Sequence, residues 1–260
     1  MIRGAVPLGT VLTLPGTGSE MNGGAVVSRK STQEKLFFIS EHTFPRFSIL
    51  DPESTYTLPQ RQFANGTIDA FVQVLEQYLT YDVNAPLQDR ASEGILRTLI
   101  EEAPKVQANP RDYDARANIM WCATNGLNGW IACGVPQDWA SHMIGHELTA
   151  LYGVDHGQSL AVVMPLMMRH QRGRKRAKLV QFGRRVWGLE GDDETVIDRA
   201  IAKTEEFFRL LGCATRLADY GIPPSAAALV AKRLADRNLR LGEHQDLGPK
   251  EVEEILSLRA

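Results

Sequence analysis

The stretch NGTIDAFVQVLEQYL, residues 65–79, sets the fold class, because its apolar residues recur at the three-four spacing of a buried helix. Similar periodicity continues through the rest of the chain. It predicts helices over residues 59–80, 86–103, 111–133, 136–151, 156–170, 173–187, 193–211, 224–236 and 248–259. Pro104 and Pro110 fall between these segments, as helix-breaking prolines usually do. We therefore expect a mainly α protein whose helices form a bundle.

The residues before position 52 show a different pattern, because their short apolar runs are β-rich or alternate with polar residues. The predicted strands lie within TVLTL (10–14), GAVVSRK (24–30), KLFFIS (35–40) and FSILDP (47–52). This is too little sheet for an independent domain. The sequence thus predicts a β segment over residues 1–51 and a helical domain over residues 52–260.

Composition excludes several classes of protein. The 260 residues are 43% hydrophobic and 23% charged with a net charge of −2, as in an ordinary globular protein without a polyanion-binding surface. The basic run RHQRGRKRAK, residues 169–178, is interpreted as a solvated helix face, so we expect no nucleic-acid partner. No apolar stretch reaches the length of about 18 residues that a membrane span requires. Cys122, Cys133 and Cys213 are widely spaced, which favours buried thiols and a cytoplasmic location.

Two side chains of the first helical segment are candidate metal ligands. Asp69 and Gln73 are four residues apart, so a helix places both on one face. With imidazole ligands, zinc or ferrous iron is expected. A carboxylate adds negative charge without fixing the identity of the metal, and the amide oxygen of Gln73 is a neutral and weak ligand. Such a site would keep open positions for water or substrate, as a Lewis-acid catalyst requires.

Three histidines follow in ASHMIGHELTALYGVDHG, residues 140–157. His142 and His146 are four apart, and His156 comes ten residues later. Spacing alone would pair His142 with His146 at the metal, but six histidines in the chain can produce this spacing by chance, so a structural role stays open. The segment is not the HExxH protease motif, because Glu147 follows the second histidine.

The glycine-rich turn LPGTGSE, residues 14–20, is a second chemical signal. Its backbone amides and hydroxyls could bind a phosphate or ribose oxygen. A tight turn between strands fits the same residues, and the chain contains neither GxGxxG nor GxxxxGK[ST].

Three segments together resemble the group III, iron-containing alcohol dehydrogenases, in particular their NADP-dependent aldehyde reductase and butanol dehydrogenase-like branch. They are TLPGTGSEMNGGAVVSRKSTQEK (13–35), DPESTYTLPQRQFANGTIDAFVQVLEQY (51–78) and HMIGHELTALYGVDHG (142–157), in the family's order and spacing. The resemblance implies the C-terminal helical domain of the dehydroquinate synthase-like fold. It also implies an N-terminally truncated chain, whose residues 1–51 are left from a missing dinucleotide-binding domain.

The same resemblance implies roles for individual residues. The family's metal ligands correspond to Asp69, Gln73, His142 and His156, with glutamine at position 73 where the family usually has histidine. His146 corresponds to a catalytic residue beside the nicotinamide and the substrate. The family's cofactor-contacting positions correspond to Thr13, Thr17, Asn22 and Lys35.

The function implied by the resemblance is hydride transfer between NAD(P)H, specifically NADP(H) for this branch, and short or medium aldehydes and primary alcohols, assisted by zinc or iron. We also expect a homo-oligomer, namely a dimer. Because the family's GGGS-type pyrophosphate loop is absent from the chain, we expect impaired activity. The alternative is a non-catalytic, metal-binding helical remnant. A metal-assisted hydrolase is a third reading, but the sequence offers no convincing general base.

Overall fold

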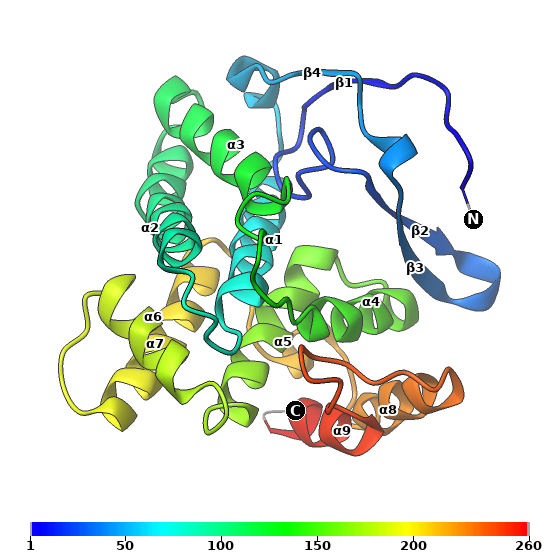
Figure 1. Cartoon of the computed structure of the whole chain (residues 1–260), viewed down its shortest axis with the longest axis vertical. Helices are drawn as coiled ribbons and strands as arrows, with labels where there is room; N and C mark the ends of the chain where they lie inside the picture. Colours follow the sequence, from blue (N-terminus) through cyan, green and yellow to red (C-terminus); the bar gives the residue numbers. More distant parts are fainter. Residues whose placement is uncertain (1, 259–260) are drawn as a thin grey trace.

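A computed structural model describes residues 2–258, so the last positions of the predicted helix 248–259 and of the predicted domain 52–260 lie outside the described residues. Within the described part, the chain is mainly helical, as predicted (Figure 1). The helices are α1 (Gln60–Tyr78), α2 (Pro86–Ala108), α3 (Tyr113–Leu127), α4 (Ala140–Tyr152), α5 (His156–His170), α6 (Arg176–Arg185), α7 (Asp193–Leu210), α8 (Ala226–Asp236) and α9 (Pro249–Ser257).

Three predicted helix ends were wrong by four or more residues. Helix α4 begins at Ala140 rather than at residue 136, because its N-cap Trp139 has a φ of 60°, a conformation that a helix cannot contain. Helix α2 continues through Pro104 to Ala108, because Ala103 and Val106 are fully buried and their packing holds the last turn despite the proline. Helix α3 ends at Leu127 rather than at residue 133. The chain then runs through a loop in which Gly129 has a φ of 90°, a conformation that a helix cannot contain.

The strands form two separate two-stranded sheets. β1 (Gly9–Val11) pairs in parallel with β4 (Phe47–Ile49), and β2 (Gly24–Arg29) pairs with β3 (Glu34–Ile39) as an antiparallel hairpin. Figure 1 shows this hairpin projecting beside the helices. All four predicted strand regions contain a strand, although β1 covers only the start of its region because the LPGTGSE turn follows.

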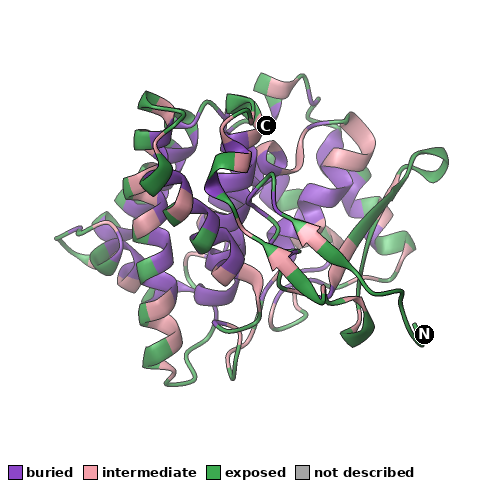
Figure 2. Cartoon of the chain, turned by 90° about the horizontal axis from the view of Figure 1, so that it is seen from above, coloured by how far each residue is buried: buried purple, intermediate pink, exposed green. Residues whose placement is uncertain are grey.

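The strand segment keeps much apolar surface in contact with solvent (Figure 2). On β3, Phe37 and Ile39 are 57% and 64% exposed, and on β4 Phe47 is 63% exposed. Because these side chains face away from the core, the core is built almost entirely by the helices.

Helices α1 and α5 form the centre of the helical region. Every residue of α1 from 63 to 78 is buried. Helix α5 contributes Leu160 and Met164 to a core with α1, α2, α3, α6 and α7, and contributes Val163 and Leu166 to a second core with α4, α8 and α9. Because α1 is buried on all sides over these residues, its polar side chains must point into the protein.

Two glycines allow other segments to approach α1 closely. A Cβ atom at Gly66 would lie 2.1 Å from the carbonyl oxygen of Pro15, and one at Gly157 would lie 2.5 Å from the Cα of Asn65. The LPGTGSE turn and the start of α5 therefore both rest directly on α1.

Burial corrects two further expectations. Lys175 and Lys178 of the basic run are buried rather than solvated, and Lys175 Nζ donates to Leu79 O at 2.6 Å and to Asp138 Oδ2 at 2.7 Å. Cys133 is exposed, although the other two cysteines are buried as expected.

Among residues 2–258, no helix combines the length and hydropathy needed to cross a bilayer.

Candidate metal centre

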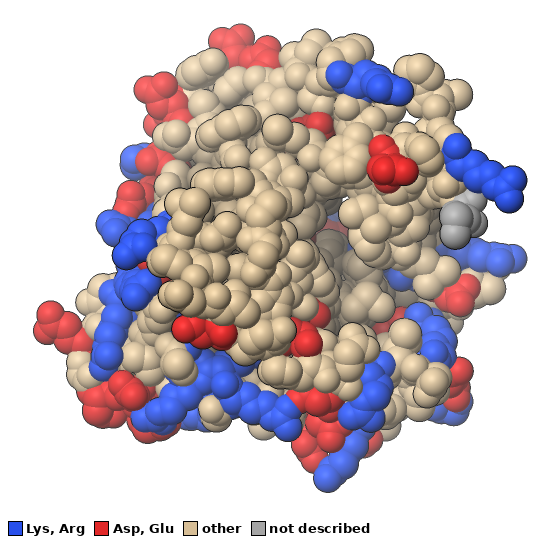
Figure 3. All heavy atoms as spheres, viewed as in Figure 1, with Lys and Arg blue, Asp and Glu red and all other residues tan. Residues whose placement is uncertain are grey.

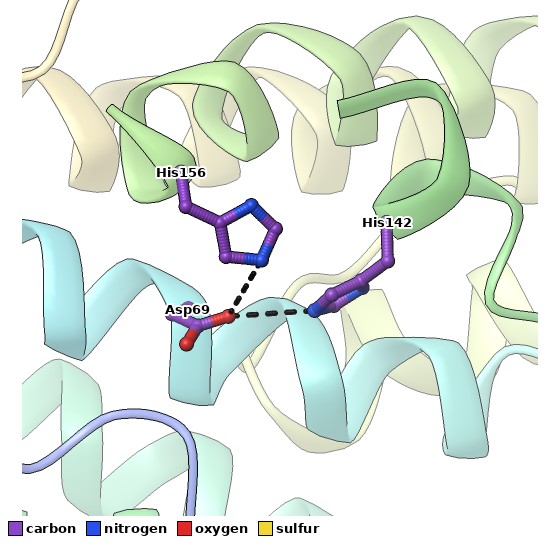
Figure 4. A group of neighbouring side chains, drawn as sticks. All are labelled: Asp69, His142 and His156. Atoms are coloured by element: carbon purple, nitrogen blue, oxygen red, sulfur yellow. Dashed lines mark hydrogen bonds and ion pairs between the residues drawn. The ribbon is translucent and has the colours of Figure 1, made fainter. Parts of the chain in front are cut away.

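Asp69, His142 and His156 converge from three helices on one point inside the protein (Figure 4). One ligand atom from each side chain lies within 4.8 Å of the other two. Asp69 Oδ1 is 3.4 Å from His142 Nε2 and 3.6 Å from His156 Nε2. A carboxylate oxygen and two imidazole nitrogens at this spacing fit a single divalent ion.

The position of His156 follows from the way α5 begins. Asp155 caps the helix in a capping box with Gln158, whose side chain accepts from the Asp155 backbone at 3.2 Å. The Asp155 carboxylate also accepts hydrogen bonds of 2.7 Å from Asn65 and Arg61 on α1. These contacts fix the first residue of α5 against α1, opposite Asp69.

The position of His142 depends on Glu76, which the sequence analysis missed. The Glu76 carboxylate accepts hydrogen bonds from the backbone N–H of Ser141 at 2.5 Å and of His142 at 3.3 Å, and it contacts His142 Nδ1. One signal was available in the sequence. Glu76 follows Asp69 by seven residues, which places both carboxylates on the same face of α1.

Gln73 lies one helical turn after Asp69 and is 2% exposed. Its Oε1 atom is buried and has no hydrogen-bond partner among residues 2–258. Buried oxygen atoms without a partner are uncommon in proteins and costly. An amide oxygen of this kind is compatible with a further, weak donor to a cation.

His146 lies beside the three converging residues without joining them. Its ring centre is 5.0 Å from that of His156 and 6.5 Å from that of His142, and its Nδ1 atom is buried without a partner within the described chain. The pair that spacing alone would select, His142 with His146, is therefore not the pair that meets Asp69.

Burial keeps two of the histidines neutral. Desolvation by burial, with smaller electrostatic effects of His156, Lys35 and His142, lowers the pKa of His146 to about 2. Desolvation also lowers the pKa of His156 to about 3, although the charge of Asp69 opposes the shift. Neutral imidazole is the form that binds metals and that offers both a donor and an acceptor.

His142 differs because it lies between two carboxylates. Burial would lower its pKa, but the charge of Glu76 and the hydrogen bonds to Asp69 and Glu76 raise it to about 9. Burial would in turn raise the pKa of Asp69, but the hydrogen bond and charges of the neighbouring histidines lower it. The site thus favours a positive charge between Asp69 and Glu76.

The proposed cofactor-contacting residues lie on the strand side of this centre. Thr13 and Thr17 are exposed in the turn that rests on α1, and a Cβ atom at Gly16 would lie 3.6 Å from Asp69 Oδ2. Lys35 on β3 is half-buried, and its charge acts on His146 and on Asp69. Figure 3 shows the surface hollowed between the strand segment and the helices on this face.

Asn22 has structural contacts that use both the nitrogen and the oxygen of its amide group. Its Nδ2 atom donates to Thr17 O at 3.1 Å and to Leu127 O at 3.2 Å, and its Oδ1 atom accepts from Gly24 N at 2.9 Å. In this arrangement Asn22 fastens the turn to α3.

Comparison with protein families gives two adjoining matches. A family model described as "Fe-containing alcohol dehydrogenase family, C-terminal" matches residues 63–259, and one described as "Iron-containing alcohol dehydrogenase" matches residues 1–52. The chain belongs to the iron-containing alcohol dehydrogenase family. The resemblance expected from the three sequence segments is thereby confirmed.

Individual relatives agree with this assignment. The chain is 54% identical over 248 residues to the NADPH-dependent aldehyde reductase YqhD of Escherichia coli K12, covering 95% of this chain and 64% of that protein. It is 39% identical over 257 residues to a probable NADH-dependent butanol dehydrogenase of Bacillus subtilis, covering 98% of this chain and 66% of that protein. The chain thus spans about two thirds of the length of these curated relatives.

Solved structures show the same fold. The crystal structure of E. coli YqhD matches with a TM-score of 0.96 at 52% identity, over 98% of this chain and 66% of that one. Butanol dehydrogenase A of Thermotoga maritima matches with a TM-score of 0.95 at 35% identity, over 100% of this chain and 67% of that one. The expected fold class, mainly helical with a short N-terminal strand segment, is confirmed.

Proposed function

We propose that this chain provides the metal- and substrate-binding part of an NADP(H)-dependent alcohol dehydrogenase or aldehyde reductase. The substrates would be short or medium aldehydes and the corresponding primary alcohols. The observation that carries the proposal is the convergence of Asp69, His142 and His156, with a neutral His146 beside them. The preference for NADP(H) rests on similarity to a relative named as NADPH-dependent.

The donor set suits zinc or ferrous iron, and a family described as iron-containing favours iron. Asp69, His142 and His156 would hold the ion, with Gln73 Oε1 as a weak fourth donor. A divalent ion there would polarise the substrate oxygen and stabilise its negative charge during the reaction.

The reaction converts an aldehyde, NADPH and a proton into a primary alcohol and NADP⁺. The carbonyl carbon would receive a hydride from the cofactor, while the C=O π electrons would move to the oxygen, which would take up the proton. His146, as a neutral imidazole, would hydrogen-bond the substrate or the nicotinamide and so orient them. Asp69, His142 and His146 are buried, and low exposure to water would strengthen these polar contacts.

The strand side of the site would meet the cofactor. Thr13, Thr17 and Lys35 would contact NADP(H) directly, as the resemblance implies. In support, Thr17 follows Gly16, whose added Cβ atom would lie 3.6 Å from Asp69 Oδ2, and the charge of Lys35 acts on His146. Asn22 would act by holding the turn, since its Nδ2 atom already donates to Thr17 O and Leu127 O and its Oδ1 atom accepts from Gly24 N. The homo-oligomer expected from the resemblance stays a prediction.

Turnover by the full chain tests this proposal. The chain, loaded with zinc or with ferrous iron under anaerobic conditions, is mixed with NADPH and a panel of aldehydes, and absorbance of NADPH is followed. Measurable oxidation should be lost in His142→Ala. It should persist in Glu93→Gln, which alters a buried carboxylate on α2 that bonds Tyr78 rather than the metal centre.

The second candidate function is metal binding without catalysis. It is favoured by Gln73 at a ligand position and by the bonded state of Asn22. Stoichiometric metal binding with no NADPH oxidation under any combination would support this second function and would contradict catalysis by this chain. Membership of the family would be unaffected.

A further inference from the structure

Glu76 is a buried carboxylate placed directly behind a proposed metal ligand. It is 2% exposed and lies on α1, seven residues after Asp69. Its Oε1 atom accepts from Ser141 N at 2.5 Å. Its Oε2 atom accepts from His142 N at 3.3 Å and contacts His142 Nδ1.

These contacts determine how the imidazole of His142 is presented. An ionised carboxylate can only accept hydrogen bonds, so Nδ1 must carry a hydrogen and donate it to Glu76. The free electron pair of the neutral ring then lies on Nε2. This is the atom that faces Asp69 Oδ1 at 3.4 Å (Figure 4). The backbone bonds to Ser141 and His142 fix the carboxylate, and therefore fix the ring as well.

We propose that Glu76 is the positioning residue of the metal centre: through His142 Nδ1 it orients the ring and makes Nε2 a stronger donor. The inference rests on the proposed metal centre. A carboxylate behind a ligating histidine is known to strengthen the bond to the ion. The effect matters more here than at a site with three histidines, because the position one turn after Asp69 holds only the weak donor Gln73.

A purely structural role for Glu76 has to be distinguished from this one. The N–H groups of Ser141 and His142 belong to the first turn of α4, so Glu76 also caps that helix. Loss of the cap alone would lower the melting temperature of the chain. It would not change the affinity or the electronic spectrum of a metal bound to the folded protein.

The variant Glu76→Gln separates the two roles. Glutamine has the same size, but its single acceptor oxygen cannot satisfy both the Ser141 N–H and the His142 ring. Glu93→Gln is the matched control, because Glu93 is also a buried carboxylate, bonded to Tyr78 at 2.9 Å and to Gln181 at 3.3 Å. Circular dichroism selects conditions under which all three proteins are folded.

The experiment measures zinc affinity by chelator competition and the visible absorption of bound Co²⁺. Glu76→Gln should bind zinc about ten- to a hundredfold more weakly than the unmodified chain and should shift the Co²⁺ bands. Glu93→Gln should match the unmodified chain in both. If Glu76→Gln binds with unchanged affinity and spectrum, the inference is overturned while the metal centre stands. If the unmodified chain binds neither ion, the metal centre fails and Glu76 has no such role.

If Glu76→Gln does not fold, a measurement on the unmodified chain tests whether Glu76 positions the His142 ring. In ¹⁵N-labelled, zinc-loaded protein, the ring nitrogens of His142 can be identified by NMR. The inference requires a protonated Nδ1 and a metal-bound Nε2. Metal on Nδ1, or a His142 ring without metal, would overturn it.

Discussion

His156 Nε2 lies 3.6 Å from Asp69 Oδ1, whereas no atom of His146 belongs to the group of converging ligand atoms. We therefore expect His156→Ala to abolish tight zinc binding and His146→Ala to leave metal content nearly unchanged while lowering turnover. Metal analysis of the purified variants distinguishes the metal-binding role of His156 from the role of His146 in turnover. Loss of the metal in His146→Ala with retention in His156→Ala would show that the helical i,i+4 pair provides the ligands.

The amide oxygen of Gln73 is a neutral donor, so the fourth position should hold zinc or ferrous iron less firmly than an imidazole would. Gln73→His should tighten metal binding by about 1–3 kcal/mol, roughly tenfold to a hundredfold in affinity. Chelator competition measures the change. Equal affinity in the variant would show that position 73 does not face the ion.

Gly157 allows α5 to rest on α1, because a Cβ atom there would lie 2.5 Å from backbone atoms of Asn65. Gly157→Ala should therefore destabilise the chain by about 1–3 kcal/mol and weaken metal binding by moving His156. Gly94→Ala is the control, since Gly94 is exposed on α2 with nothing within 4 Å of its added Cβ. That variant should gain about 0.5–1 kcal/mol in urea unfolding. Equal stability of the two variants would contradict the close packing.

The helices were predicted well where the three-four spacing of apolar residues indicated both the helix and the side that is buried. In α1, for example, the three-four periodicity of the apolar residues agrees with burial in the protein, so its predicted range is nearly that observed. Pro104 misled the prediction because the penalty of a proline in a helix is outweighed by the packing of Ala103 and Val106, which periodicity does not measure.

The candidate metal centre could be predicted from the sequence only in part, for a similar reason. Residues on one helix, such as Asp69 and Gln73, are related by spacing, but His156 reaches Asp69 through the packing of α5 on α1 at Gly157. Resemblance to the family suggested this pair, which spacing could not. Glu76 was missed because its partners, Ser141 and His142, belong to another helix.

Burial of Lys175 also depends on distant segments, and it has a consequence for pH. Lys175 Nζ bonds Asp138 at 2.7 Å and Glu243 at 2.8 Å, beside Arg174, His244 and Asp246. Burial, with the nearby Asp138 carboxylate, raises the pKa of Glu243 from an ordinary 4.5 to about 7, although Lys175 opposes the shift. The folded state therefore holds this proton more tightly than the unfolded state does.

The resulting stability is fully present below pH 4.5 and is lost as the pH rises through about 7. As the pH rises from about 5 to about 7.5, we expect the ionisation of Glu243 to lower the free energy of unfolding by about 1 kcal/mol, after allowance for solvent screening. Glu243→Gln should remove this part of the pH dependence in urea unfolding experiments. An identical pH profile in the variant would show that Glu243 titrates normally.

Anomalous diffraction from crystals of the zinc-loaded chain tests whether Asp69, His142 and His156 bind the metal, because it locates the ion without reference to activity. We predict one strong peak at the zinc edge, about 2.0–2.2 Å from Asp69 Oδ1, His142 Nε2 and His156 Nε2. A peak bound through His146 in place of His156, or no peak among these side chains in crystals that contain zinc, would contradict it.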